Sequence, residues 1–227
     1  MTAPAASSAW LEALSLVGHE LRRPLTVIRG AATLLLEMDD EVPAATRGEL
    51  LGLIDRSVQG MSDLIEDLVL AAHLDAGQVA VSPEAVPVDE LLAEVAVRFR
   101  RSDPGRSLRA FPAGDGVMVE ADRSYAARAL RALVARALSR SPQDATVELL
   151  AEVEPERVRL LVRDQGPEPP GEAEGLFEPF GPGAGQSSAG LGLYLAKGLA
   201  RAMGGDVEAL LGAGGGSTFS FNLIRRV

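Results

Sequence analysis

The sequence contains no cysteine, two histidines and a single lysine among its 227 residues. The absence of cysteine excludes disulfide bonds and metal sites built from thiolates, and we expect a reducing, cytoplasmic location. Because Lys197 is the only lysine, nearly all of the positive charge comes from arginine. No apolar run approaches the roughly 18 residues that a membrane-spanning helix needs. The sequence therefore predicts no membrane span in this chain.

Acidic residues outnumber basic ones, and the formal net charge is −10. A negative surface repels a phosphate backbone, so we expect no nucleic-acid partner. The segment from Met1 to Ser8 consists mostly of small residues and lacks the basic region that opens a secretory signal peptide, which predicts a loose tail. With 47% hydrophobic and 24% charged residues, the composition is typical of a globular protein of one large or two small domains.

Two long helical patterns occupy the first third of the chain. Apolar residues recur at spacings of three and four over residues 9–38 and again over residues 50–72. A turn that contains Pro43 separates the two patterns, and Gly77 ends the second one. The sequence therefore predicts an antiparallel helical hairpin. One hairpin cannot enclose its own apolar faces, so we expect two copies to pair into a homodimeric four-helix bundle.

The remainder of the chain alternates short β-branched runs with helical patterns. We expect a sheet covered by three helices, and therefore an α+β sandwich in the second domain. The expected strands are residues 79–81, 107–111, 117–120, 146–153, 157–162, 206–211 and 217–224, and the expected helices are 88–101, 123–141 (capped by Asp122) and 190–203. Residues 164–189 contain six glycines and five prolines, which predicts a loop. The domain boundaries that follow are 1–78 and 79–227.

One histidine lies inside the first helical pattern, beside a carboxylate and five residues before a proline. A neutral imidazole carries a lone pair at physiological pH, so His19 on a solvated helix face is a candidate nucleophile. Taken alone, such a histidine is more often an ordinary surface residue. Pro24 lacks an N–H group, and we expect it to kink the helix just beyond His19. The other histidine, His73, is expected to complement the end of the second helix, without a catalytic role.

The run His-Glu-Leu-Arg-Arg-Pro-Leu-Thr at residues 19–26 resembles the H-box of two-component sensor histidine kinases. In that family the matching histidine is the phosphoacceptor, so the resemblance implies that His19 carries a phosphoryl group. The adjacent carboxylate, Glu20, would orient the ring or accept its proton. The family also implies a homodimer and a partner, the receiver domain of a response regulator.

The second half of the chain resembles the catalytic ATP-binding domain of the same family, whose fold is shared with Hsp90-type and gyrase-type ATPases. Leu-Asp-Ala-Gly at residues 74–77 is similar to the sequence that closes the family's hairpin, and Leu-Phe-Glu-Pro-Phe at 176–180 is similar to the F-box. The resemblance implies that ATP is bound by two glycine-containing segments and by a lysine one turn into the helix that follows. The first segment, the G1 box, is Asp-Gln-Gly at 164–166 here, and the second, the G2 box, is Gly-Leu-Gly-Leu at 190–193. The matching residues here are Asp164, Gly166, Gly190, Leu191, Gly192 and Lys197.

Several positions depart from the family pattern. The N-box asparagine, which holds Mg²⁺ against the nucleotide phosphates, is Arg136 here, and the usual lysine is Ser139. A guanidinium has no acceptor atom, so Arg136 cannot ligate Mg²⁺, and we expect no metal ligand in this chain. Arg136 either pairs with a phosphate oxygen bidentately or occupies a solvated position over an abandoned site.

Four further departures affect the loops and the H-box. The second G1 glycine is Glu168, the first G2 glycine is Ser188, and the lid at 181–189 is short. A carboxylate repels nucleotide phosphates, so we expect ATP binding to be weak or lost, and Arg136 predicts that it depends poorly on Mg²⁺. The residue four after His19, a threonine or asparagine in phosphatase-competent relatives, is Arg23.

Two functions remain open on these motifs. In the first, the chain is a cytoplasmic histidine kinase-like signalling protein that carries phosphate on His19 and passes it to a response-regulator aspartate. Its ATP-driven autophosphorylation is then reduced or lost. In the second, the chain is a non-catalytic phosphotransfer or docking protein, a pseudokinase with a vestigial nucleotide pocket. The retained Asp164 and the glycines of G1 and G2 favour the first function, whereas Arg136 favours the second.

Overall fold

The computed structural model describes residues 5–38, 42–103, 105–167, 175–179, 190–211 and 215–226, with side chains from Val17 onward apart from those of Met38 and Leu211. Contacts within the chain divide it into two compact units, Met1–Val69 and Leu70–Val227, and each is described by itself. Within the described residues, no helix combines the length and the hydropathy needed to cross a membrane.

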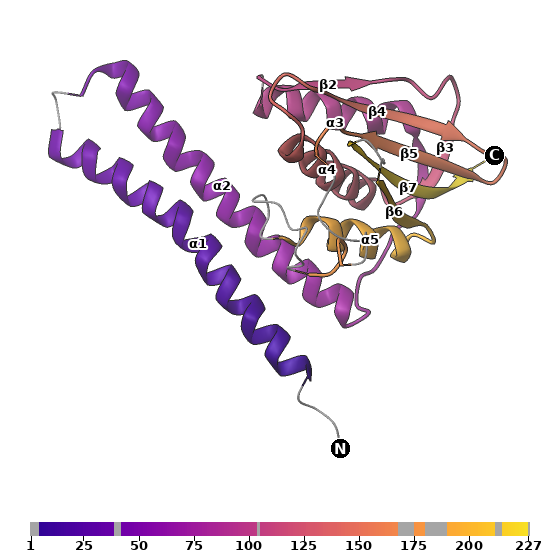
Figure 1. Cartoon of the computed structure of the whole chain (residues 1–227), viewed down its shortest axis with the longest axis horizontal. Helices are drawn as coiled ribbons and strands as arrows, with labels where there is room; N and C mark the ends of the chain where they lie inside the picture. The colour runs from indigo at the N-terminus through magenta and orange to yellow at the C-terminus, as the bar shows by residue number, and fades with distance from the viewer. Residues whose placement is uncertain are drawn as a thin grey trace. The chain divides into compact units, whose positions relative to one another are not determined.

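The first unit is a pair of long antiparallel helices (Figure 1). Helix α1 spans Ala5–Met38, and α2 spans Ala44–Asp75. Val17, Ala31 and Leu64 are buried, as the helical periodicity requires. The predicted hairpin is therefore confirmed. Helix α1 continues through Pro24 as one element, so the proline does not end the helix.

The second unit is a seven-stranded sheet in the order β1-β3-β7-β5-β4-β2, with β6 also paired to β7. All neighbouring strands are antiparallel except β2 and β4, which are parallel. The strands are β1 Glu84–Pro87, β2 Ser107–Ala110, β3 Met118–Ala121, β4 Thr146–Val153, β5 Arg157–Arg163, β6 Asp206–Leu211 and β7 Ser217–Arg226. The helices are α3 Val88–Ser102, α4 Arg123–Arg140 and α5 Gly192–Ala202.

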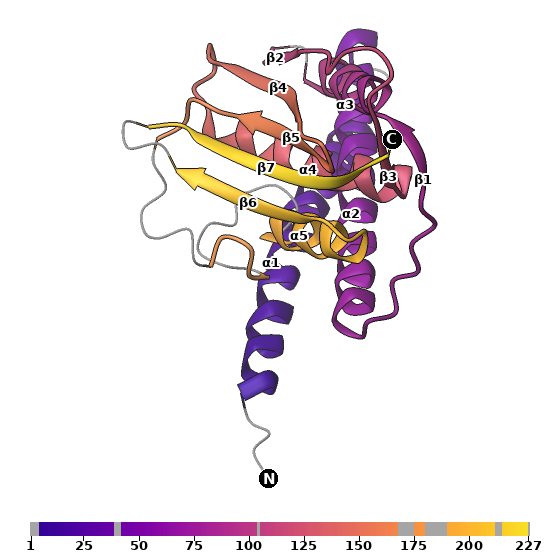
Figure 2. The same cartoon turned by 90° about the vertical axis from the view of Figure 1, so that its right-hand side faces the viewer.

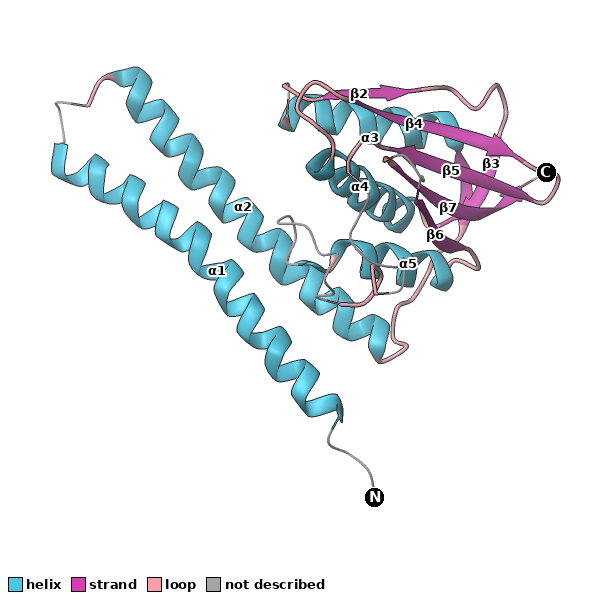
Figure 3. Cartoon of the chain, viewed as in Figure 1, coloured by secondary structure: helices cyan, strands magenta, loops and turns pink. Residues whose placement is uncertain are grey.

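Helices α3, α4 and α5 cover one face of this sheet (Figures 2 and 3). The core between them contains fully buried large side chains from both layers, among them Leu91, Leu130, Leu160, Leu199 and Phe221. This arrangement confirms the α+β sandwich predicted from the alternating patterns. The helices and the later strands begin and end within a few residues of their predicted bounds.

The first strand of the sheet is where the prediction was wrong. Residues 79–81 are neither helix nor strand, and β1 begins instead at Glu84. The antiparallel pairing of β1 with β3 places Val86 opposite Val119, and both side chains are fully buried. Long-range pairing therefore selects this register, although the apolar run at 79–81 has the stronger local pattern.

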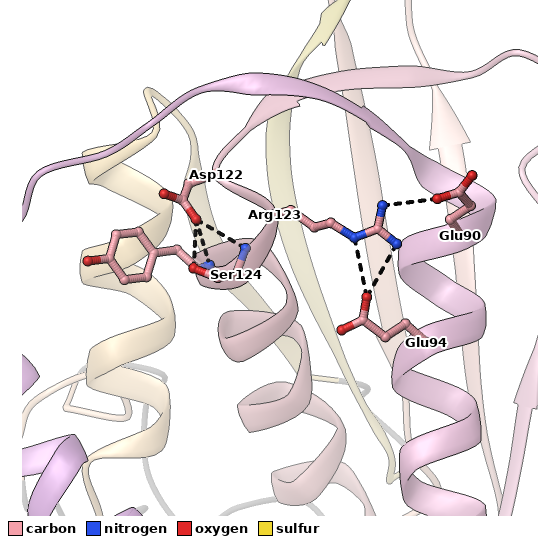
Figure 4. A network of polar contacts seen from close by, with 6 residues as sticks. Glu90, Glu94, Asp122, Arg123 and Ser124 are labelled. Carbon is pink, nitrogen blue, oxygen red and sulfur yellow. Dashed lines mark hydrogen bonds and ion pairs between the residues drawn. The ribbon is translucent and has the colours of Figure 1, made fainter.

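Polar contacts fix the start of α4 (Figure 4). Asp122 is the N-cap, and its carboxylate accepts hydrogen bonds from the backbone N–H groups of Ser124 and Tyr125, as the sequence predicted. Partial burial acts to raise the pKa of Asp122, but a hydrogen bond from the Ser124 hydroxyl, together with the bonds from the backbone N–H groups of Tyr125, Ser82 and Ser124, outweighs it and holds the pKa below its ordinary value. The next residue, Arg123, forms ion pairs with Glu90 and Glu94 of α3. Helix α4 is thus held to α3 at its first turn.

The last turn of α2 belongs to the second unit. The hydroxyl of Tyr194 in α5 donates a hydrogen bond to the carboxylate of Asp75, and Leu74 packs against Gly198 one turn later in α5. A Cβ atom at Gly198 would lie 2.7 Å from Leu74 Cδ1, so the glycine allows this close packing. Burial, together with the bond to Asp75, raises the pKa of Tyr194 to about 12.

We expect the Tyr194–Asp75 contact to make stability depend on alkaline pH. The folded pKa of about 12 exceeds the unfolded value of about 10, so the unfolded chain loses its proton first. The contribution of this contact to the free energy of unfolding is therefore fully present below pH ~10 and is lost as the pH rises towards 12. Urea unfolding of the wild type should weaken more steeply over this range than that of Tyr194→Phe. Tyr125→Phe, which leaves the contact intact, should keep the wild-type slope, and equal slopes for Tyr194→Phe and the wild type would contradict the assignment.

Candidate functional site

His19 lies on an exposed face of α1 in the helical unit. Its side chain is 68% exposed, whereas that of the adjacent Glu20 is only 22% exposed. The distance from His19 Nδ1 to Glu20 Oε1 is 3.9 Å, which is an electrostatic contact rather than a hydrogen bond. Pro24 has no N–H group, so the helix bond that would reach the carbonyl of Glu20 is missing beside the histidine. The imidazole is therefore accessible to a macromolecular partner.

Asp164 follows directly after β5 in the second unit, and it is buried. Its Oδ1 atom accepts backbone hydrogen bonds from Gly166 at 2.8 Å and from Ser217 at 3.1 Å. Among the described residues, its Oδ2 atom has no hydrogen-bond partner. One oxygen thus organises the turn, and the other remains an acceptor for a ligand amino group. This arrangement fits the adenine-binding role that the G1 resemblance implies.

The turn at Gly166 rests against the C-terminal end of α4. A Cβ atom there would lie 2.7 Å from the carbonyl oxygen of Arg140, which only glycine avoids. The Arg140 side chain also donates a hydrogen bond to the carbonyl of Pro167 at 3.3 Å. The G1 segment is therefore attached to the last turn of α4.

The G2 segment begins α5. Gly190 has a φ of +76°, a conformation that favours glycine, and Leu191 is the N-cap residue. Leu191 has no side-chain acceptor, so the first N–H groups of α5 lack a side-chain cap. A Cβ atom at Gly192 would lie 3.5 Å from Ala132 Cβ, which places this helix start against α4. Uncapped N–H groups at a helix N-terminus form a site for an anion such as a phosphate.

Arg136 lies on α4 and is only 8% exposed. Its Nε atom is buried without a hydrogen-bond partner in the described part of the chain. Burial lowers its pKa below the ordinary value; the charge of Arg140 adds to this effect, and that of Asp164 opposes it. The interpretation of Arg136 as a solvated helix position is therefore wrong.

Lys197 points to β6 in this structure. Its ammonium donates a hydrogen bond to the carbonyl of Val207 at 2.8 Å and lies 3.5 Å from the carboxylate of Asp206. It also lies 4.5 Å from the ring centroid of Phe177, a cation–π contact that joins the F-box to α5. Phosphate binding by Lys197 stays a prediction that requires these contacts to be exchanged. The sequence offered no signal for the contact with Phe177.

The chemistry of the described residues fits a nucleotide better than it fits a bound Mg²⁺. Asp164 offers a free acceptor, and the start of α5 offers free donors. At the position expected for the metal ligand stands Arg136, a permanent cation without acceptor atoms. The described residues contain no group of three histidine, aspartate or glutamate side chains that could hold a metal ion. A guanidinium at this position therefore offers Mg²⁺ no protein ligand.

Some predicted features lie outside the described residues. These are Glu168 in G1, Ser188 before G2, the lid at 181–189 and the last F-box residue, Phe180. Arg23, at the position of the phosphatase-associated residue, is exposed on α1.

Two family models match the chain. Residues 9–77 match the His Kinase A (phospho-acceptor) domain, and residues 121–226 match the histidine kinase-, DNA gyrase B-, and HSP90-like ATPase. The chain belongs to the two-component sensor histidine kinase family. The phosphoacceptor match contains His19, and the ATPase match contains Arg136, Asp164 and the start of α5.

Individual relatives agree with this membership. Sensor protein KdpD of Mycobacterium tuberculosis is 31% identical over 219 residues, which cover 92% of this chain and 25% of KdpD. The structure of full-length ShkA in complex with AMPPNP has a TM-score of 0.68 and 27% identity, over 95% of this chain and 46% of ShkA. Histidine kinase AdeS of Acinetobacter baumannii shares the fold, with a TM-score of 0.69 and 23% identity over 91% of this chain and 97% of AdeS. The chain spans about a quarter of the length of the first curated relatives it matches.

The close approach of Gly166 to α4 yields a test of the G1 geometry. Gly166→Ala places a Cβ atom against the backbone carbonyl of Arg140, which cannot swing away as a side chain would. We expect the free energy of unfolding to fall by about 1–3 kcal/mol. Gly105→Ala is the matched control, because its Cβ atom would have only an ordinary contact at 3.8 Å. Chemical unfolding of both variants measures the effect, and equal stabilities would show that the turn is not held against α4.

Proposed function

We propose that this chain is a cytoplasmic histidine kinase-like signalling protein that carries phosphate on His19 and passes it to a response-regulator aspartate. The observation that carries the proposal is the exposed imidazole of His19 in the segment matched by the phospho-acceptor domain. An exposed side chain on a rigid helix is open to a receiver domain, and a neutral imidazole is a competent nucleophile. ATP-driven autophosphorylation is reduced or lost in this proposal.

The transfer itself is a reversible phosphoryl exchange. An imidazole nitrogen of His19 attacks the phosphorus of an aspartyl phosphate, the bond between phosphorus and the aspartyl oxygen breaks, and the carboxylate leaves. In the signalling direction the same steps run in reverse. The carboxylate of Glu20 lies 3.9 Å from the ring, on the same exposed stretch of α1. Such transfers depend mainly on positioning and electrostatics, so an exposed, correctly placed histidine is the chief requirement on this side.

The reduced ATP-driven step follows from Arg136. Bound metal normally neutralises triphosphate charge and aligns the γ-phosphoryl group. In this chain a buried guanidinium occupies the position of the protein ligand to that metal. ShkA, a relative with 27% identity, has been solved with the ATP analogue AMPPNP, which supports a nucleotide-binding origin for this domain.

A second candidate function is a non-catalytic phosphotransfer or docking protein with a vestigial pocket. Arg136 is the observation that favours it, because a site that cannot place Mg²⁺ in the family manner lacks the usual means of activating ATP. Both candidates share phosphate carriage on His19. They differ in whether the chain labels itself from ATP, and the rate of self-labelling with Mg-ATP separates them.

We expect His19 to be the only site of phosphate carriage. A purified response-regulator receiver domain, charged with radiolabelled acetyl phosphate, should transfer label to this chain as an acid-labile, base-stable phosphate. His19→Gln should abolish this label, because the amide has no nucleophilic ring nitrogen. His73→Gln is the matched control and should label as the wild type does. Label that survives His19→Gln would place the phosphoacceptor elsewhere.

The homodimer is part of the proposal, and the hairpin supplies its argument. Leu51, Val58 and Ile65 of α2 recur at spacings of seven, and all three are exposed in the single chain. Large apolar side chains at heptad spacing form the seam of a coiled coil. Other large side chains exposed on the same hairpin are Leu25, Val27, Leu34, Leu36, Leu53 and Val69. A second copy of the hairpin would cover this surface.

We expect a charge in this apolar seam to separate the dimer. Val58 is 48% exposed in the single chain, so Val58→Glu should leave the hairpin folded and break the contact with a second copy. Gly60→Glu is the matched control: it adds the same charge on another side of α2, where a Cβ atom meets nothing within 4 Å. Sedimentation of the full chain should give a dimer for the wild type and the control, and a monomer for Val58→Glu. A monomeric wild type at micromolar concentration would contradict the proposal.

A further inference from the structure

One face of α4 joins the two ends of the nucleotide site. Ala132 lies against the start of α5, because a Cβ atom at Gly192 would be 3.5 Å from Ala132 Cβ. Arg140 lies against the G1 turn through the close approach of Gly166 and a hydrogen bond to Pro167. Residues four apart share one face of a helix, about 6 Å apart along its axis. Arg136 therefore lies midway between the G1 and G2 segments.

The side chain of Arg136 is largely buried, and its charge has no ion-pair partner among the described residues. It is 92% removed from solvent, and its Nε atom has no hydrogen-bond partner in the described part of the chain. Within the described residues Arg136 forms no ion pair, so the attraction of Asp164 acts without direct contact. Burying an uncompensated charge destabilises a folded chain. A bound anionic ligand would compensate the charge of Arg136 and so account for its burial.

The start of α5 supplies donors for the same anion. Helix α5 has 11 residues, its N-cap side chain offers no acceptor, and its first N–H groups carry the positive end of the helix dipole. The first residue of this helix, Gly192, lies against Ala132, which is one helical turn from Arg136 on the same face of α4. Two independent features, a buried unpaired guanidinium and an uncapped helix start, thus adjoin one region.

We propose that Arg136 takes the place of the divalent cation, so that this site binds a nucleoside polyphosphate free of metal. The inference rests on the proposed nucleotide-binding origin of the domain and names the form of the ligand that the site accepts. The planar guanidinium engages phosphate oxygens in a bidentate manner, and the N–H groups of α5 bind the remaining oxygens. Asp164, through its free Oδ2 atom, binds the amino group of the base.

This arrangement reverses the usual effect of magnesium. A metal ion that arrives with the nucleotide brings two positive charges next to a buried cation, and like charges in a poorly solvated site repel strongly. It also occupies phosphate oxygens that the guanidinium needs. Metal-free ATP therefore binds better than Mg-ATP, in contrast to a site in which an asparagine ligates the metal.

The experiment is calorimetric titration of the full chain with ATP, once in EDTA and once in excess Mg²⁺, at constant ionic strength. We expect the wild type to bind ATP at least threefold more tightly in EDTA. Arg136→Asn should weaken binding in EDTA by tenfold or more, and its affinity should increase when Mg²⁺ is added. Arg136→Lys, which keeps the charge but not the planar fork, should lie between the two. Arg98→Asn, an exposed arginine of α3, is the matched control and should behave as the wild type does.

Ligand-free stability provides a second readout. Arg136→Met removes the buried charge and keeps a side chain of similar length, so its unfolding midpoint in urea should equal or exceed that of the wild type. ATP in EDTA should raise the midpoint of the wild type but not that of Arg136→Met.

The outcomes separate this inference from the proposed function. Tighter binding of Mg-ATP than of metal-free ATP by the wild type, or unchanged binding in Arg136→Asn, overturns the role of Arg136. Absence of nucleotide binding in both conditions overturns it as well. None of these results alters the labelling of His19 by a charged receiver domain, and a failure of that labelling leaves the magnesium dependence unchanged.

Discussion

The candidate nucleotide site depends on one packing constraint, the burial of α4 against the sheet and beside α5 (Figure 2). Leu130, Leu133 and Val134 are fully or almost fully removed from solvent, so this helix cannot rotate without exposing its core face. Asp122 and Arg123 fix its first turn, and Gly166 approaches its last. With both ends held, the face that carries residue 136 must look towards the G1 and G2 segments. Whatever residue stands at that position therefore takes part in the chemistry of the pocket.

Much of this architecture was predictable from the sequence, because periodicity and capping are local signals. The hairpin, the Asp122 cap and the pairing of β4 with β5 all follow from short windows of residues. The position of β1 was not predictable in this way, since its partner β3 lies more than thirty residues later in the chain. Helix α1 runs through Pro24 as one element, because packing along a long helix compensates one lost hydrogen bond.

The candidate site likewise combines features that local motifs predict with features that depend on tertiary packing. Motif spacing identified Asp164 and Gly166, and the structure explains both: the carboxylate organises the turn, and the missing Cβ admits α4. The burial of Arg136 could not be derived from the sequence, because arginine is usually exposed and the covering elements are distant in the chain. The contacts of Lys197 with Val207 and Phe177 likewise depend on tertiary packing.

Phosphate carriage and nucleotide binding have separate physical requirements in this chain. The first needs an accessible imidazole, which α1 provides through the exposure of His19. The second needs charge compensation on α4, where the cationic Arg136 is largely buried. We therefore expect a substitution at position 136 to change nucleotide binding and to leave the nucleophilicity of His19 unchanged, since the two residues belong to different compact units. In the function that we propose, Arg136 therefore affects metal-dependent ATP chemistry, whereas phosphate exchange with a receiver domain depends on His19 alone.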